Sequence, residues 1–260
     1  MSRIFDFTDA IVRRPGASVV KGLRAGGGDD PTLDGVLAEH AGYVAALRSA
    51  GLTVEELEPL EDFPDAIFVE DPALVFTQGA ILLRPGAPSR EAEGQYLRDA
   101  LNRRFPRVLQ QTDGYADGGD VLVMPDRAWI GLSARTDRTG AAALGALLEE
   151  LGIRWQVAET PAEVLHLKTA SSLVDEETVL ATAPLVASGI FAGYRVLEVP
   201  AGEEGGANVL RVRDTLLVGT GYPRLAEMLD GYGAKVTVLP NAEIAKIDAG
   251  FTCMSLRWRA

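Results

Sequence analysis

The chain has 260 residues, of which 47% are hydrophobic and 24% are charged, a composition typical of a globular protein with a substantial core. Its 25 basic and 37 acidic residues give a formal net charge of −12, which disfavours nucleic acid and anionic membranes as partners. A single cysteine excludes an internal disulfide framework and fits a reducing compartment. No apolar run is long enough for a signal peptide or a membrane span, so we expect a cytoplasmic protein.

The N-terminal part of the chain predicts a strand, a loop, a helix and a second strand. The first strand is expected at residues 10–13. The glycine-rich stretch 26–31 predicts a mobile surface loop. Apolar residues then recur at helical spacing over 32–50, and the pattern stops at Gly51. The second strand is expected at 53–57.

Four later segments share one pattern, two short strands around a polar turn. These segments are 73–83, 120–132, 171–182 and 208–219. A helical pattern follows each of them, at about 90–104, 138–151, 184–191 and 223–232, the third being the weakest. A further short strand follows each helix, at 108–110, 154–157, 195–199 and 235–239. Alignment of Val75, Val123, Val174 and Val212 gives steps of 48, 51 and 38 residues, which indicates a structural repeat.

The two ends of the chain contain the parts of a fifth unit. Residues 251–258 predict a strand that could pair with 10–13, and such pairing would leave no open sheet edge. We therefore predict an α/β fold in which residues 1–260 form a single domain. This domain is a fivefold pseudosymmetric ββαβ propeller, closed by pairing of its N- and C-terminal strands. A doubly wound parallel sheet is the alternative that the pattern leaves open.

The residues with nucleophilic or metal-binding chemistry are few, because the chain has two histidines and one cysteine. They do not have the spacing of a zinc motif, and neither a phosphate-binding glycine loop nor a G-x-S-x-G elbow is present. His40 falls within the first helix, where we expect a helix-surface or core-edge residue. His166 has apolar neighbours, so it is either a hydrogen-bonded core residue or an acid/base. Cys253 begins the last strand, as either a small buried side chain or a nucleophile that faces a central cavity.

Acidic residues gather in two short segments. Asp65, Glu70 and Asp71 lie in the first segment, and Asp117 and Asp120 bracket a double glycine in the second. Burial of a carboxylate is costly unless a cation pairs with it. The residues alone therefore leave two possibilities open, solvent-exposed turns or a pocket that holds a planar cation through paired hydrogen bonds.

Taken together, these stretches resemble the dimethylarginine dimethylaminohydrolases, a family of the guanidine-modifying (pentein) superfamily. The matching segments run in the family's order through nearly the whole chain. They are FPDAIFVEDPALV (63–75), LLRPGAPSR (82–90), DGGDVL (117–122), IGLSART (130–136), LHLKT (165–169), NVL (208–210), GYP (221–223) and KIDAGFTCMS (246–255). The resemblance implies a fivefold ββαβ propeller and an enzyme that needs no metal and no organic cofactor.

The resemblance also implies a role for each matched residue. Cys253 would be the nucleophile and His166 the general acid/base, with Asp117 between His166 and the substrate. Some relatives have Glu at this last position, and Asp shortens the reach by one methylene. Asp71, with Glu70 beside it, would hold the guanidinium. The other implied contacts are Arg90 and Arg135 to the α-carboxylate, Asp65 and the Leu23 carbonyl to the α-amino group, and Phe68, Ile247 and Asp248 along the pocket wall.

The implied reaction is hydrolysis of Nω-methylated arginine to citrulline and methylamine or dimethylamine, through a covalent thiouronium on Cys253. A related hydrolase of arginine or citrulline is one alternative, and a ligand-binding paralogue without turnover is another. The expected partner is a small cationic amino acid, and the protein is expected to be a monomer or a homodimer. Glycines near Gly26 make this loop a candidate lid over the pocket.

Overall fold

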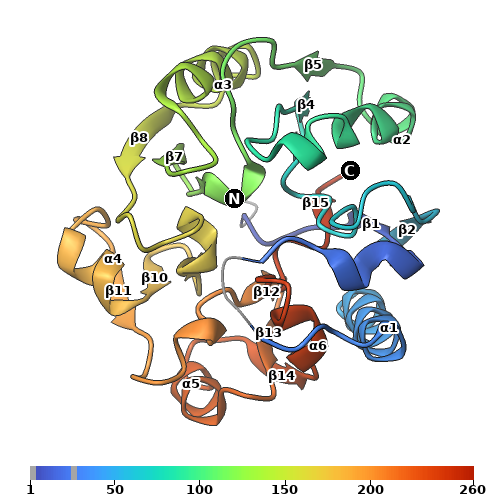
Figure 1. Ribbon diagram of the computed structural model, residues 1–260. Coiled ribbons are helices and arrows are strands. Elements are labelled where there is room, and N and C mark those ends of the chain that lie inside the picture. Colours follow the sequence, from blue (N-terminus) through green and yellow to red (C-terminus); the bar gives the residue numbers. More distant parts are fainter. Residues whose placement is uncertain (1–3, 25–27) are drawn as a thin grey trace.

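The computed structural model describes residues 4–24 and 28–260, so the expected lid around Gly26 lies largely outside the described residues. The described strands form five sheets of three strands each. Figure 1 shows these sheets arranged around a common centre, with the longer helices toward the outside. Five separate sheets contradict the doubly wound alternative, which requires one continuous parallel sheet.

Each sheet follows the same plan. Its central strand pairs antiparallel with one neighbour and parallel with the other. In the order antiparallel neighbour, central strand and parallel neighbour, the strands are β15 (Leu256–Trp258), β1 (Asp9–Arg13) and β2 (Thr53–Leu57); β3 (Ala73–Phe76), β4 (Gly79–Leu82) and β5 (Val108–Gln110); β6 (Val121–Val123), β7 (Ala128–Leu132) and β8 (Trp155–Glu159); β9 (Ser171–Leu173), β10 (Thr178–Ala181) and β11 (Arg195–Glu198); and β12 (Leu210–Val212), β13 (Thr215–Gly219) and β14 (Lys235–Leu239).

A helix joins the central strand to its parallel neighbour in every unit, because a parallel pair needs a crossover connection. These helices are α1 (Leu33–Ser49), α2 (Arg98–Arg104), α3 (Arg138–Glu150), α4 (Ala183–Ser188) and α5 (Pro223–Leu229). Side-chain caps start the two longest: Thr32 accepts from the Gly35 amide at 3.2 Å, and Asp137 accepts from the Gly140 amide at 2.6 Å. The structure therefore confirms a repeated ββαβ unit. No helix in the described part of the chain is both long and apolar enough to cross a membrane.

The two ends of the chain meet in one sheet. Asp9 in β1 lies opposite Trp258 in β15, so the predicted pairing of the terminal strands is confirmed. The last strand is shorter than expected and begins at Leu256, because residues 251–254 form turns. The guanidinium of Arg257 stabilises these turns by donating to the Thr252 carbonyl at 2.9 Å.

A second difference concerns the helix expected over residues 90–104. The segment instead contains two 3-10 turns, Pro88–Arg90 and Glu93–Tyr96, followed by α2. Arg90 and Glu93 turn inward and form a buried ion pair of 2.7 Å. Since these charged side chains face the interior, the segment does not present the continuous apolar face of a single helix.

Candidate active site

Five equivalent loops supply the central residues of the candidate site. In each unit, a short loop or 3-10 turn precedes the antiparallel neighbour of the central strand. Asp71 precedes β3, Asp117 precedes β6, His166 precedes β9, Asn208 precedes β12 and Cys253 precedes β15. Because the units repeat, residues far apart in the sequence occupy the same place in successive units. Side chains from these loops contact one another, as in the Asp117–His166 and Asn208–Cys253 pairs.

The imidazole of His166 is fixed by Asp117. The ring Nε2 lies 3.0 Å from Oδ2 of Asp117, and the other carboxylate oxygen of Asp117 accepts from the Gly86 amide at 2.7 Å. Burial alone would lower the pKa of His166, but the hydrogen bond to Asp117 and the charges of Asp71 and Asp120 raise it to about 9. His166 is therefore an imidazolium at neutral pH, the form that can protonate a leaving group.

The double glycine of DGGD lets two loops approach closely. A Cβ atom at Gly119 would lie 2.9 Å from Oδ1 of Asp71 and 2.9 Å from the His166 ring. The Gly119 amide donates to the same Asp71 oxygen at 3.1 Å. One side-chain atom each of Asp71, Asp117 and His166 lies within 4.8 Å of the others. Any larger residue at position 119 would separate these three groups.

Asp120 has a different role from Asp117, a distinction that the sequence leaves open. Its carboxylate accepts from the Ser133 and Thr136 hydroxyls at 2.6 and 2.7 Å, and from the Leu167 amide at 2.9 Å. Asp120 thus holds the backbone next to His166. The Thr136 hydroxyl in turn accepts from the Asp117 amide at 3.1 Å. Asp120 is a buried positioning residue, and burial raises its pKa.

Asp71 is held by Arg90 as well as by the glycine loop. The Arg90 guanidinium forms a buried ion pair with Asp71 and also donates to the Phe68 carbonyl at 3.1 Å. Burial opposes ionisation of Asp71, but the neighbouring Arg90 charge outweighs it, so the pKa of Asp71 is lowered. Arg90 is only 4% exposed. Its predicted contact with a substrate carboxylate therefore stays a prediction, whereas its contact with Asp71 is direct.

The other predicted substrate contacts surround Asp65. Its Oδ1 accepts from the Leu23 amide at 2.8 Å, and burial raises the pKa of Asp65. A Cβ at Gly22 would lie 3.2 Å from both Asp65 and Ile247, so the Leu23 segment packs against this part of the site. Asp248 follows Ile247 with a φ of 56°, a left-handed conformation that is uncommon outside glycine.

Phe68 and Arg135 complete the predicted set. Phe68 is buried, and its ring faces the Arg90 guanidinium, whose central carbon lies 6.0 Å from the ring centroid. Nη1 of Arg135 lies 3.9 Å from Oδ2 of Asp117, and the Arg135 side chain is 21% exposed. Arg135 is therefore a partly accessible cation at the edge of the acidic cluster. This placement fits a group that could bind an anionic end of a ligand.

Cys253 is a free thiol that sits among these charges. Burial, followed by the negative charges of Asp71 and Glu70, raises the pKa of Cys253 to about 11, although Lys168 acts in the opposite direction. The thiol is therefore protonated at neutral pH. A cation bound beside Asp71 would offset the negative charge and favour the thiolate.

Sequence reasoning missed two further residues of this region. The Asn208 amide donates to the Cys253 sulfur, with 3.6 Å between Nδ2 and Sγ. Lys168 forms a buried ion pair with Glu70 at 2.8 Å. Both residues lie inside segments that carry the family resemblance, NVL and LHLKT. Asn208 also occupies the loop before β12 that is equivalent to the loops of the other site residues, and this repeat position is the signal that could have identified it.

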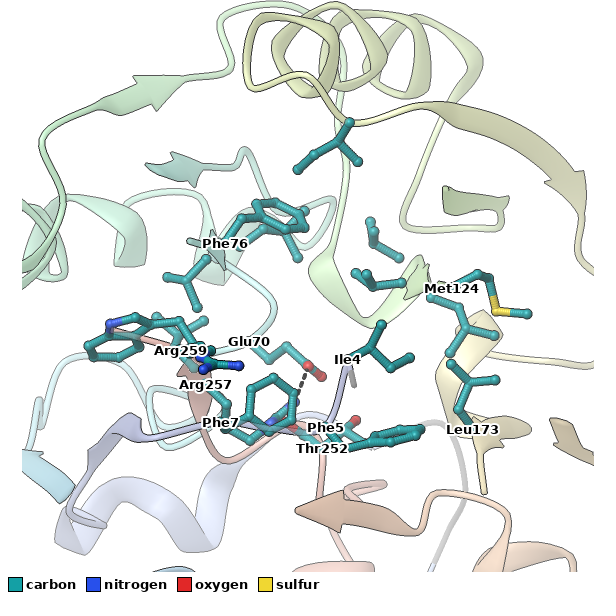
Figure 2. Close-up of a pocket in the computed structure, with 18 of the residues that line it drawn as sticks. Ile4, Phe5, Phe7, Glu70, Phe76, Met124, Leu173, Thr252, Arg257 and Arg259 are labelled. Carbon is teal, nitrogen blue, oxygen red and sulfur yellow. Dashed lines mark hydrogen bonds and ion pairs between the residues drawn. The ribbon is translucent and has the colours of Figure 1, made fainter. Parts of the chain in front are cut away.

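Glu70 separates this site from a cavity of about 860 Å³ (Figure 2). Its carboxylate pairs with Lys168 on one oxygen and with Arg257 on the other, each at 2.8 Å. In the described part of the chain, the cavity is lined by Glu70, Lys168 and Thr252 but not by Cys253 or His166. Figure 2 shows large apolar side chains, among them Phe7 and Phe76, around Glu70 and Arg257. A role for Glu70 in holding a guanidinium stays a prediction, because two cations already engage its carboxylate.

The same three groups, Asp71, Asp117 and His166, could also hold a metal ion, since their potential ligand atoms lie within 4.8 Å of one another. Asp71 already pairs with Arg90, and Asp117 accepts from Gly86. These contacts leave little free ligand capacity for a divalent ion, which takes four or more ligands. A planar organic cation needs only one or two accepting oxygens on each edge. The predicted independence from metals stays a prediction.

The raised pKa of His166 predicts that folding stability falls with rising pH. The His166 pKa is about 9 in the folded protein against 6.5 for an ordinary histidine. Its stabilising contribution is therefore complete below pH 6.5 and is lost as the pH rises through 9. We expect the free energy of unfolding to decrease by ~3 kcal/mol over this window, measured by urea denaturation. His166→Gln should show a flatter pH dependence, and equal slopes in both proteins would contradict the interpretation.

The fold and the residues at its centre define the class of this protein. Five ββαβ units that bring a thiol, an imidazole and buried carboxylates together are the arrangement of the guanidine-modifying (pentein) superfamily. The chain also resembles the N-terminal domain of ArgZ, an arginine dihydrolase, with a TM-score of 0.84 at 17% identity over 97% of both chains. At this identity the likeness concerns the fold alone.

Closer relatives specify the family. The family model for eukaryotic N,N dimethylarginine dimethylhydrolase matches residues 28–184. The dimethylarginine dimethylaminohydrolase of Pseudomonas aeruginosa is 34% identical, over 97% of this chain and 100% of the relative. The one from Streptomyces coelicolor is 36% identical, over 96% of both chains. The chain therefore belongs to the dimethylarginine dimethylaminohydrolase family, which confirms the resemblance noted in the sequence.

Two solved structures of this family are similar to the chain over almost its whole length. A cysteine-to-serine mutant of the Pseudomonas aeruginosa protein, complexed with citrulline, has a TM-score of 0.94 and covers 97% of this chain and 100% of its own. A histidine-to-glycine variant, solved as an adduct with S-methyl-L-thiocitrulline, has a TM-score of 0.93, 35% identity and coverage of 96% and 99%.

Proposed function

We propose that the protein hydrolyses the guanidinium C–N bond of Nω-methylated arginine, giving citrulline and methylamine or dimethylamine. The observation that carries this proposal is the cluster of Asp71, Asp117 and His166, in which one side-chain atom of each lies within 4.8 Å of the others. Cys253 adjoins the cluster, because its backbone carbonyl accepts from the amide of Glu70, the residue before Asp71, at 3.1 Å. Relatives that bear this activity in their names, and a relative's complex with citrulline, support it.

Recognition of the guanidinium follows from the buried carboxylates. Asp71 and Asp117 are 4% and 0% exposed and are held in place by Arg90 and His166, and each carboxylate oxygen can accept a further hydrogen bond. A planar guanidinium can donate to Asp71 while its charge lowers the pKa of the nearby Cys253 thiol. The substrate would in this way generate the thiolate that attacks it.

The protonation states of Cys253 and His166 support a two-stage reaction. As the substrate binds, the Cys253 thiol loses its proton to solvent and the thiolate attacks the central guanidinium carbon. The C–N bond then breaks as His166, an imidazolium, gives its proton to the departing amine. A positively charged thiouronium remains on Cys253. His166, now neutral, takes a proton from water as the water attacks the same carbon. In the collapse of this second adduct the C–S bond breaks, the hydroxyl proton of the adduct passes to the departing sulfur, and citrulline is released with the Cys253 thiol restored.

The remaining site residues fit the amino-acid end of the substrate. Arg135 is the accessible cation of the cluster, and we assign the α-carboxylate to it, with Arg90 behind. Asp65 lies against Leu23, and we assign the α-amino group to this pair. Phe68, Ile247 and Asp248 would line the pocket. Such anchoring of a flexible substrate orients the reacting carbon and lowers the entropic part of the barrier.

The coarser features of the protein are consistent with this function. We propose that the five sheets close into a propeller within a single domain of residues 1–260, which the β1–β15 pairing supports. A cytoplasmic location fits the single free cysteine. The monomer or homodimer expected from the sequence stays a prediction.

The decisive experiment is a panel of four substrates, namely dimethylarginine, monomethylarginine, arginine and citrulline. We expect citrulline and the methylated amine to form in equal amounts from the first two compounds, with kcat/KM at least tenfold higher than for ammonia release from arginine. Amine, ammonia and ureido products are measured separately. Predominant release of ammonia would instead identify a related guanidine or ureido hydrolase. A protein that binds these compounds without turnover would be the non-catalytic paralogue.

The Arg135→Ala variant tests how the protein binds the α-carboxylate of the substrate. The variant should raise KM for dimethylarginine by roughly 10- to 100-fold, because a charge-assisted hydrogen bond to a carboxylate contributes about 1.5–3 kcal/mol. Its effect on dimethylguanidine, which has no α-carboxylate, should be small. The exposed Arg138 on α3 offers a matched control, since it pairs with Glu159 at the surface. An equal effect on both substrates would refute the assignment.

A further inference from the structure

Asn208 occupies the one equivalent loop to which the family resemblance assigns no role. The other four loops supply Asp71, Asp117, His166 and Cys253. We propose that Asn208 is a catalytic residue that donates a hydrogen bond to the Cys253 sulfur and stabilises its thiolate. This inference rests on the proposed function only for its consequence in turnover, because the contact with the thiol is a property of the free protein.

Asn208 holds three consecutive residues at the nucleophile. Its backbone carbonyl accepts from the Phe251 amide at 3.4 Å, and its side-chain Oδ1 accepts from the Thr252 amide at 3.0 Å. Its Nδ2 then donates to Sγ of Cys253 at 3.6 Å. The turn that carries the thiol is thereby aligned with the donor. Asn208 is itself 6% exposed, so water competes little for this donor.

The orientation of the Asn208 amide follows from its partners. The backbone N–H of Thr252 is a donor, and the only acceptor in the Asn208 side chain is its oxygen, because the NH₂ group can only donate. The oxygen must therefore face Thr252, which leaves the NH₂ group toward the sulfur. Gly250 allows Asn208 to pack closely against this turn, because a Cβ at position 250 would lie 2.3 Å from Cβ of Asn208. A larger residue at position 250 would push Asn208 away from the thiol.

A neutral donor suits this position electrostatically. The charged groups that act on the thiol are Asp71 and Glu70, which raise its pKa, and Lys168, which lowers it. The imidazolium of His166 also acts on Asp71, whose Oδ1 lies with the His166 ring beside Gly119. A second cation next to the sulfur would also favour the thiolate, but it would pair with Asp71 and repel a cationic substrate. An amide stabilises the anion without either disadvantage.

The test uses the reaction of the thiol with iodoacetamide, a small neutral reagent. Because the chain has one cysteine, the alkylation rate reports on Cys253 alone. Below the thiol pKa this rate rises about tenfold per pH unit, in proportion to the thiolate fraction. Asn208→Asp keeps the acceptor for Thr252 but replaces the donor by a carboxylate. We expect its alkylation rate at pH 8 to fall at least tenfold, with kcat for dimethylarginine reduced more than KM is raised.

Two further variants make the outcome unambiguous. Asn208→Ala removes the donor without adding charge and should slow alkylation in the same direction by a smaller factor, about three- to tenfold. Gln111→Glu is the matched control, since Gln111 is 1% exposed and its amide donates to the Asp113 carbonyl. This variant should alkylate at the wild-type rate. Circular dichroism and thermal unfolding establish which variants are folded.

The possible results separate this inference from the proposed function. Unchanged alkylation in folded Asn208→Asp or Asn208→Ala would overturn the inference even if the wild-type protein hydrolyses dimethylarginine. Slower alkylation in both variants supports the contact even if no guanidine substrate is turned over, and in that case the proposed function fails instead. Equal slowing in Gln111→Glu would also overturn it, because the effect would then follow from loss of a buried amide in general.

Discussion

Cys253→Ser is expected to lower turnover of dimethylarginine by at least about 10⁴-fold, as removal of a catalytic nucleophile does in other hydrolases. Burial and the charges of Asp71 and Glu70 already raise the pKa of the thiol to about 11. A serine hydroxyl is a much weaker acid than a thiol, so its alkoxide would be far less accessible in the same place. The loss is measured as citrulline formed at saturating dimethylarginine, and it should appear in kcat.

Ligand binding shows whether the Cys253→Ser site remains intact. The carboxylates of Asp71 and Asp117 are unchanged in this variant, and the contacts that bind the substrate before the reaction do not need the thiol. Calorimetry should therefore detect binding of dimethylarginine within about tenfold of the wild-type affinity. A haloacetamidine should label the wild-type protein once and leave the variant unlabelled, because Cys253 is the single cysteine. Full activity of the serine variant would exclude the covalent mechanism.

His166→Gly is expected to separate the two halves of the reaction. Loss of a general acid/base lowers turnover by roughly 10²- to 10⁴-fold. A substrate whose leaving group is an alkylthiolate needs little protonation for that group to depart, so the first half should still proceed. The second half needs a base to activate water and should stall. Intact mass spectrometry should therefore detect a covalent adduct on Cys253 that persists in the variant and decays in the wild-type protein.

The other histidine of the chain offers a control for this experiment. His40 lies within α1 and is 3% exposed, and burial lowers its pKa to about 4. His40 is thus a neutral core residue, more deeply buried than the helix-surface or core-edge position expected from the sequence. His40→Gln should reduce stability without accumulation of an adduct. An adduct that persists equally in both variants would show that His166 does not activate the water.

The repeated unit could be predicted from the sequence because it depends on local patterns. Strand alternation, helical spacing and caps such as Thr32 act over a few residues, and the strands 108–110, 235–239 and 53–57 have the bounds that the pattern predicts. The prediction was wrong where a tertiary contact replaced local preference. Arg90 turns inward to Asp71 and the Phe68 carbonyl, and the expected helix is interrupted there. The turns before Leu256 shorten the last strand.

The candidate site was predicted less completely, because its contacts join distant parts of the chain. The residue types, Cys253, His166 and the acids, could be selected from the motifs. Their partners could not: the Asn208–Cys253 contact spans 45 positions, and the Arg257–Glu70 ion pair spans 187. The separate roles of Asp117 and Asp120 are decided by which carboxylate faces the His166 ring and which faces the Leu167 amide.

By itself, the sequence determined the family, the number and order of the ββαβ units and the chemical groups available for catalysis. These properties follow from residue identity, spacing and periodicity along the chain. Only the tertiary structure decided which charge meets which, and therefore the protonation of each group. His166 is held as a cation and Cys253 as a neutral thiol because burial strengthens electrostatic interactions between residues that different repeats bring together.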